Sequence, residues 1–430
     1  MLHLITDHRA PAESRPSQAL LAVTLLVVAA NLRPTITAYG SLVGVIGNDT
    51  GLGAGALGVL GAIPLLAFAA VSPAVHHLTD RIGLDRAVLV STAVLVVGTA
   101  IRSLPGTDGV ISLWAGTAIL GAAIAVGNVA VPAIVKRDFP REVPLVTGIY
   151  TAVLSTTAAF ASGLALPIAQ RTGWRVGLGI WGVLSVLALL AWLLRLRPVR
   201  ASASTTGPVR VTAGRSMWRS AVAWQVTLLM GAQATSFYLL VTWLPTIEVS
   251  FGVDPVTAGW HSFVYQIVGI AAGLGVTVVM RGRTDHRLVG VAISLLLMVA
   301  IAGLLLVPAL PLLWLVLAGL SGGSSLVIAL TLVGERARSS VDAGRLSGMA
   351  QSIGYLLSAG GPIGAGLLFS ATGSWTYPLL GVIAIGAAQL VICLYAGRDR
   401  FTHPAGADGS DGAEPAHPGD GTALSGIAPQ

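Results

Sequence analysis

The 430-residue chain is 54% hydrophobic and only 10% charged, with a mean hydropathy of +0.81. An ordinary soluble domain carries about 25% charged residues, so a soluble enzyme or nucleic-acid-binding protein is excluded and a polytopic membrane protein remains. The net charge of +7 does not indicate a nucleic-acid partner, because the basic residues fall in short segments between apolar runs, as membrane topology requires.

Twelve apolar runs are long enough to cross a bilayer, which takes about 20 mostly apolar residues. We expect helices, because strands of a membrane barrel would alternate over about 10 residues. The fold class predicted is therefore all-α, with spans at 20–46, 52–75, 87–104, 110–135, 145–170, 174–195, 220–247, 255–280, 288–307, 309–334, 346–370 and 374–396.

The run at 19–30 also has the length of a signal peptide. Asp7 and Glu13 precede this run, however, and apolar sequence resumes after Pro34. We therefore interpret the stretch as part of the first span and residues 1–19 as a cytoplasmic tail.

The basic residues set the expected orientation. With the N-terminus inside, 21 of the 25 cations face the cytoplasm and three, Arg102, Arg171 and Arg175, face outward, while Arg33 lies within the first run. This asymmetry predicts a multi-pass protein of the cytoplasmic (inner) membrane with both termini in the cytoplasm.

The chain divides into two six-helix halves, 20–195 and 220–396, joined by a cytoplasmic linker at 196–219. A polar tail at 397–430, rich in Gly, Pro and Asp, is expected to be disordered. Positions match at an offset of about 200 residues: Thr147-Gly148 answers Ser347-Gly348, and Arg86 answers Arg287. Two parallel repeats predict a secondary transporter with its binding site between the halves; chance matches in a Gly-rich chain are the alternative.

The loop after the second run reads His-His-Leu-Thr-Asp-Arg-Ile-Gly-Leu-Asp-Arg over 76–86. Asp80, Arg81, Gly83 and Arg86 resemble the loop signature of the major facilitator superfamily, although His76 replaces the leading Gly. The resemblance implies a major facilitator fold and a gating role for these four residues, with a kink at Pro34 as a further gating element. The alternative is that these charged residues only set the orientation of the helices in the membrane and have no gating role.

Two further strings resemble the cyanate and 2-nitroimidazole transporter family. These are Asn-Leu-Arg-Pro at 31–34 and the run at 127–140 that ends Lys-Arg-Asp-Phe-Pro. The resemblance implies transport of a small anion or small polar heterocycle. The sequence departs from proton-coupled drug exporters, which carry an Arg in helix 4 where Thr117 stands here and a Gly-Pro-rich string in helix 5 that is absent.

Arg33 is the most informative single residue. It stands about 20 Å along the first helix at ~1.5 Å per residue, where a charge costs ~2.5–3.5 kcal/mol. The nearest acids, Glu248, Glu335 and Asp80, all lie near the ends of runs. A guanidinium without an acidic partner suits a carboxylate, nitro group or cyanate; a structural Arg bonded to carbonyls around Pro34 is the alternative.

The major facilitator resemblance implies a cavity between helices 1, 4, 7 and 10, with contributions from helices 2, 5, 8 and 11. For each buried amide, the alternative is a hydrogen bond to a neighbouring helix. For Trp243, the alternative is a position in the aromatic belt at the membrane interface. His261 could carry a proton, but with no carboxylate deep in any run, proton coupling stays open. The substrate-binding residues expected on this basis are Arg33, Asn31, Asn128, Tyr150, Gln233, Tyr238, Trp243, His261, Gln266 and Gln351.

The function predicted is secondary active or facilitative transport of a small anion or polar heterocycle by alternating access. A multidrug/proton antiporter is the alternative within transport, and a membrane-embedded sensor or enzyme lies outside it. No catalytic set, metal-ligand spacing or phosphate-binding loop is visible, so we expect no enzyme activity and no cofactor. The expected partners are the substrate and the lipid bilayer, protons being left open, and the protein is expected to be a monomer.

Overall fold

The computed structural model describes residues 18–105, 109–196 and 216–402. Most of the expected linker at 196–219 and of the two tails therefore lies outside the described residues. Within the described ranges the regular structure is helical, without strands, and twelve segments are long and apolar enough to cross a membrane. The all-α prediction and the predicted spans are confirmed, with ends that agree to within a few residues.

The first half contains nine helices, several of which share one span. They are α1 (Gln18–Ala29), α2 (Pro34–Thr50), α3 (Ala54–Val71), α4 (Val75–Ile82), α5 (Leu84–Arg102), α6 (Gly109–Asp138), α7 (Val143–Thr172), α8 (Trp174–Gly179) and α9 (Gly182–Leu196). The second half contains α10 (Ala221–Ser250), α11 (Pro255–Met280), α12 (Arg287–Leu306), α13 (Pro311–Glu335), α14 (Ser340–Thr372) and α15 (Thr376–Ala396).

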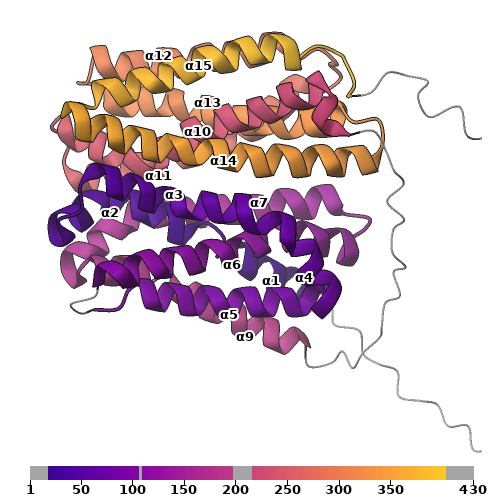
Figure 1. Ribbon diagram of the computed structural model, residues 1–430, viewed down its shortest axis with the longest axis horizontal. Coiled ribbons are helices and arrows are strands. Elements are labelled where there is room, and N and C mark those ends of the chain that lie inside the picture. Colours follow the sequence, from indigo (N-terminus) through magenta and orange to yellow (C-terminus); the bar gives the residue numbers. More distant parts are fainter. Residues whose placement is uncertain (1–17, 106–108, 197–215, 403–430) are drawn as a thin grey trace, which may run out of the picture.

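The helices run side by side along the long axis, with α1–α9 on one side of the molecule and α10–α15 on the other (Figure 1). We call the end where α1 begins and α15 ends the terminal end, and the other the far end. Three helix pairs make the most extensive contacts between the halves: α2 with α10, α3 with α14, and α7 with α11. A binding site between the halves must therefore be bordered by some of these helices.

The first span is broken in its middle. Residues 30–33 form a turn between α1 and α2, in which Asn31 and Leu32 donate their backbone N–H groups to carbonyls three residues back. Pro34 begins α2, the position where its missing N–H costs no helical hydrogen bond. The kink expected at Pro34 is thus a complete interruption, with Arg33 at its end.

The two halves touch closely in the far-end part of the bundle. A Cβ atom added at Gly40 of α2 would overlap the carbonyl oxygen of Val241 in α10, and one at Gly58 of α3 would overlap that of Pro362 in α14. The α7–α11 pair is joined by a hydrogen bond of 2.7 Å from Gln266 Nε2 to Ser162 Oγ. These contacts close the far end between the halves.

Candidate functional site

A cavity lies between the halves in the part of the bundle nearer the terminal end. It consists of two adjoining chambers of about 250 and 380 Å³, the smaller lined mainly by α7, α11 and α13 and the larger by α6, α7, α10 and α14. Both chambers include Arg33, Thr147, Thr151, Phe237 and Leu326. A space of this size holds a small molecule rather than a polymer.

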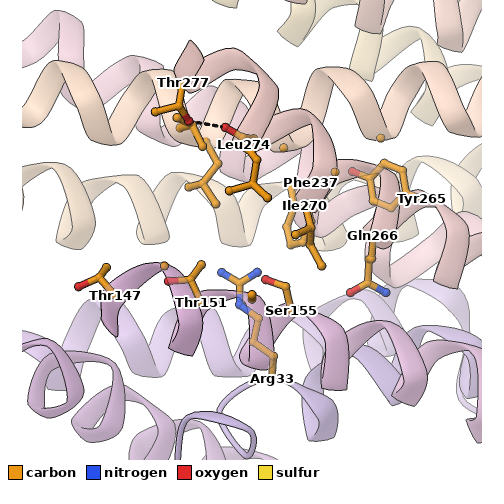
Figure 2. A pocket seen from close by; sticks show the side chains of 18 residues that line it. Arg33, Thr147, Thr151, Ser155, Phe237, Tyr265, Gln266, Ile270, Leu274 and Thr277 are labelled. Carbon is orange, nitrogen blue, oxygen red and sulfur yellow. Dashed lines mark hydrogen bonds between the residues drawn. The ribbon is translucent and has the colours of Figure 1, made fainter. Parts of the chain in front are cut away.

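Arg33 lines both chambers because the break in the first span places it there. Its guanidinium extends from the first half towards Thr151 and Ser155 (Figure 2), and its Cζ lies 5.7 Å from the centroid of the Phe237 ring. The side chain is half-buried and, among the residues that the structure describes, forms neither an ion pair nor a hydrogen bond. The cavity therefore presents an uncompensated positive charge.

Hydroxyl groups from α7 lie next to this charge, and none of them was among the residues predicted from the sequence. Thr147, Thr151 and Ser155 all line the smaller chamber, and Figure 2 shows them along one side of α7 next to Arg33. Their spacing of four residues places them on one face of a helix, which was a readable pattern. Hydroxyls can donate to the oxygens of an anion, so they complement the guanidinium.

Six of the predicted site residues besides Arg33 do line the cavity. Asn128, Tyr150, Gln233, Tyr238 and Gln351 line the larger chamber, and Gln266 lines the smaller one. Three of the amides already have hydrogen-bond partners. Gln351 Nε2 donates to Ser347 Oγ at 2.9 Å, Gln266 Nε2 donates to Ser162, and Gln233 Nε2 donates to Met230 Sδ at 3.3 Å. Contact of these residues with a substrate stays a prediction.

Asn31 does not line the cavity. Its Nδ2 donates to the carbonyls of Val27 and Leu184, and its Oδ1 accepts a hydrogen bond from Ser185 at 2.8 Å. The residue is 2% exposed and faces α9, on the opposite side of the chain from Arg33. Asn31 ties the break in the first span to its own half, and a binding role for it stays a prediction.

Trp243 and His261 also lie outside the cavity, in the closed far-end part. Trp243 is 1% exposed, donates from Nε1 to the carbonyl of Pro362 and packs on Trp375, so it is a core residue rather than a ligand contact. His261 Nδ1 lies 2.6 Å from Glu248 Oε1. Neither residue lines the two chambers in the state described, and substrate contact of either stays a prediction.

Glu248 changes one premise of the sequence analysis. It stands near the end of α10, but its side chain is completely buried. A helix end near the membrane surface is hydrated only where neighbouring helices leave it open, and here the neighbours cover it. Its place near the end of a run therefore did not indicate that the carboxyl is buried.

The expected gating residues lie at the terminal end. Gly83, with φ of 84°, joins α4 to α5, while Asp80, Arg81 and Arg86 are exposed and make no hydrogen bond or ion pair within the described part of the chain. In the first half, the ionic contacts at this end come instead from Asp85 and Asp138, which pair with Arg137 and Arg195. A gating role for the exposed loop residues stays a prediction.

The second half has a charged pair at the corresponding position. Arg287, which answers Arg86 in the repeat, bonds Asp285 in the short segment before α12. Hydrogen bonds from Arg287 lower the pKa of the Asp285 carboxyl to about 2. This carboxylate is therefore ionised at any physiological pH. No group of three or more His, Cys, Asp or Glu among the described residues is arranged to hold a metal ion.

Twelve spanning helices in two halves, with a small cavity between the halves that is closed at one end, define a membrane transporter of the two-half type. The chain belongs to the Major Facilitator Superfamily, which matches residues 25–359.

Relatives extend over nearly the whole chain. The 2-nitroimidazole transporter of Escherichia coli K12 is 35% identical over 388 residues, which are 90% of this chain and 98% of the relative. The cyanate transport protein CynX of the same organism is 25% identical and covers 85% of this chain and 95% of its own. These matches confirm the resemblance to the cyanate and 2-nitroimidazole transporter family.

The fold is also that of solved transporters. A bacterial homologue of the human lysosomal transporter Spinster, in an inward-facing and unoccupied conformation, superposes with a TM-score of 0.68 at 16% identity, covering 89% of this chain and 96% of its own. At that identity the likeness concerns the fold alone.

Proposed function

We propose that the protein carries a small anion, or a small polar heterocycle with an acceptor group such as a nitro group, across the cytoplasmic membrane by alternating access. The observation that carries this proposal is the guanidinium of Arg33 in the cavity, which has no acidic partner among the described residues. The names of two relatives, for 2-nitroimidazole and cyanate, fit the same chemistry. We infer transport rather than catalysis.

The charge of the cavity lining favours this substrate class over lipophilic cations. Arg33 is the only ionised side chain among the residues that line the two chambers, and no acid faces them. An exporter of cations would place its substrate beside a positive charge without compensation. A planar guanidinium can instead form two parallel hydrogen bonds to a carboxylate, nitrate or nitro group.

The cavity and the closed far end indicate the state of the cycle. The terminal end carries the excess of basic residues, and we assign it to the cytoplasm on that ground. The structure then corresponds to an inward-facing state in which Arg33 is reached from the cytoplasmic side. We expect a monomer, because one chain contains both halves of the site.

A thermal-shift screen on purified protein tests the proposal. The panel contains cyanate, nitrate, acetate, 2-nitroimidazole and tetraphenylphosphonium, and each ligand is added to wild type, Arg33→Gln and Arg33→Lys. At 100 times its dissociation constant, a ligand adds ~2.7 kcal/mol to the free energy of unfolding. We expect an anion or the nitro compound to stabilise wild type but not Arg33→Gln, with Arg33→Lys in between because it keeps the charge and loses the fork.

Arg171→Gln is the matched control, because it removes an exposed cation at the far end, away from the cavity. It should respond as wild type does. Equal stabilisation of wild type and Arg33→Gln by tetraphenylphosphonium, with no response to any anion or to the nitro compound, would instead favour the multidrug exporter.

A further inference from the structure

Glu248, which is fully buried, contacts His261, which is 14% exposed, and the substrate site uses neither residue. Oε1 of Glu248 lies 2.6 Å from Nδ1 of His261, and the carboxyl side chain has no exposed surface. Its second oxygen, Oε2, is buried without a hydrogen-bond partner in the described structure. His261 stands five residues before the cavity residue Gln266 on α11, about 7.5 Å along the helix axis.

The contact lies within the far-end interface between the halves. On either side of His261, a Cβ at Gly259 would meet the carbonyl of Ser162 in α7, and Trp260 and Phe263 pack against Gly163 of the same helix. Residues 241–242 of α10, two turns before Glu248, meet α2 and α3. Separation of the halves at the far end would therefore open the helix surfaces that bury this pair.

No nearby cation compensates a negative charge on Glu248. The other ionisable groups at the far end of the packed helices are Tyr39 and Asp49 on α2, Arg171 on α7, Asp254 and Tyr265 on α11, and Tyr377 on α15. Arg171 is exposed to solvent at the last turn of α7. Tyr39 donates to a carbonyl, Asp49 binds Trp174 and Arg175, Asp254 caps α11, Tyr265 is buried and Tyr377 is 53% exposed. The described parts of α13 and α14 have no ionisable group at this end.

This isolation decides the proton content of the closed pair. A neutral His261 that donates from Nδ1 to an ionised Glu248 would leave a net negative charge on a carboxyl that has no exposed surface, which is costly. One additional proton makes the pair neutral overall, either as two neutral groups or as an ion pair. When water reaches the pair, a free carboxyl near pKa 4.3 and a free imidazole near about 6.5 hold no such proton at neutral pH.

We propose that Glu248 and His261 form a proton-binding site in the far-end gate, which takes up one proton from the far-side solution when the gate closes and returns it when the gate opens. The proposal rests on the alternating-access cycle proposed above. The closed state binds one proton more than the open state, so acidification favours closure. The closed-to-open ratio can rise by at most about tenfold per pH unit, in the range above the titration of the hydrated pair.

Distances between spin labels across the far end measure this ratio. The labels are placed by Thr172→Cys and Thr372→Cys, at exposed positions that end α7 and α14 in opposite halves, in a Cys393→Ala background because Cys393 is the single native cysteine. Pulsed electron paramagnetic resonance in nanodiscs from pH 5.5 to 8.5 should show the short distance gaining population towards acid pH in the protein with the native pair.

Glu248→Gln should remove this pH dependence and keep the short distance populated, because the amide is neutral at every pH. Glu248→Met, similar in volume and without polar atoms, is the second variant and should do the same. The matched control is Glu335→Gln. It removes the carboxyl of the other His–Glu contact, His286 Nε2 to Glu335 Oε2 at 2.8 Å, which lies at the terminal end, and it should keep the native dependence.

Three results would overturn the proposal: distances that do not change with pH when the native pair is present, the native dependence in both Glu248 variants, or its loss in Glu335→Gln. The substrate proposal is judged separately by ligand stabilisation at one pH. Glu248→Gln should keep that stabilisation, since Glu248 does not line the cavity. The two proposals can fail separately. If every Arg33 variant still binds the anion, while Glu248→Gln abolishes the pH response, the substrate site is refuted and the proton site stands.

Discussion

Replacing Gly40 by Ala should shift the protein towards a state that is open at the far end. In the closed interface the new Cβ would overlap the backbone carbonyl of Val241 and approach that of Thr242 at 3.3 Å. Backbone atoms within a helix cannot turn away as a side chain can, so α2 and α10 must separate. Overpacking of this kind costs about 1–3 kcal/mol, which corresponds to a ~5- to 150-fold loss in the closed-to-open ratio.

Gly44→Ala is the matched control on the same helix. Gly44 lies one turn after Gly40, is exposed, and a Cβ there would meet no atom within 4 Å. Both substitutions gain the same ~0.5–1 kcal/mol of helix propensity, so the difference between them isolates the interface contact.

The label pair at positions 172 and 372 measures the effect. We expect the short far-end distance to dominate in wild type and Gly44→Ala, and to lose population in Gly40→Ala. Identical distance distributions in the two Ala variants would refute the reasoning, because the contact at Gly40 would then not depend on closure.

Three smaller predictions concern stability and binding, with unfolding followed on heating by the reaction of buried Cys393 with a thiol probe. Asp138→Asn should lower the free energy of unfolding by about 1–3 kcal/mol, because it weakens the ion pair of Arg195. Arg195 is 5% exposed and would keep only Asp85, at 3.2 Å, as an acidic partner. An unchanged unfolding temperature would contradict this. Asn31→Ala should cost a similar ~1–3 kcal/mol by leaving buried groups unpaired but leave ligand affinity intact, and a weakened affinity would restore Asn31 to the site. Thr151→Val should weaken anion binding about two- to tenfold by removing one donor, with little loss of stability; unchanged binding in a titration would place the substrate elsewhere.

The spans and the cation of the cavity could be predicted because each depends on the free energy of placing a short segment of the chain in the bilayer. An apolar run of about 20 residues has few alternatives to crossing the bilayer, and a charge within such a run must face a cavity or a partner. Arg33 satisfied both conditions, and its position on the wall of both chambers follows from them.

Residues whose role depends on the relative placement of helices were harder. Asn31 and Arg33 differ by two positions, and only the packing of α9 decides which of them faces inward. Glu248 looked peripheral because depth along a helix says nothing of what covers its side. The hydroxyls of α7 were readable from their spacing, but Ser and Thr are common in spanning helices, so periodicity alone did not single them out.

The interruption of the first span also determines how the cavity is built mechanically. α1 packs within its own half, on α6, α7 and α9, whereas α2 reaches α10 of the other half. The joint between them is four residues long, and Arg33 is its last residue. The guanidinium that faces the cavity therefore belongs to the joint between α1 and α2. Any rotation of α2 that opens the far end must also change the direction of this side chain.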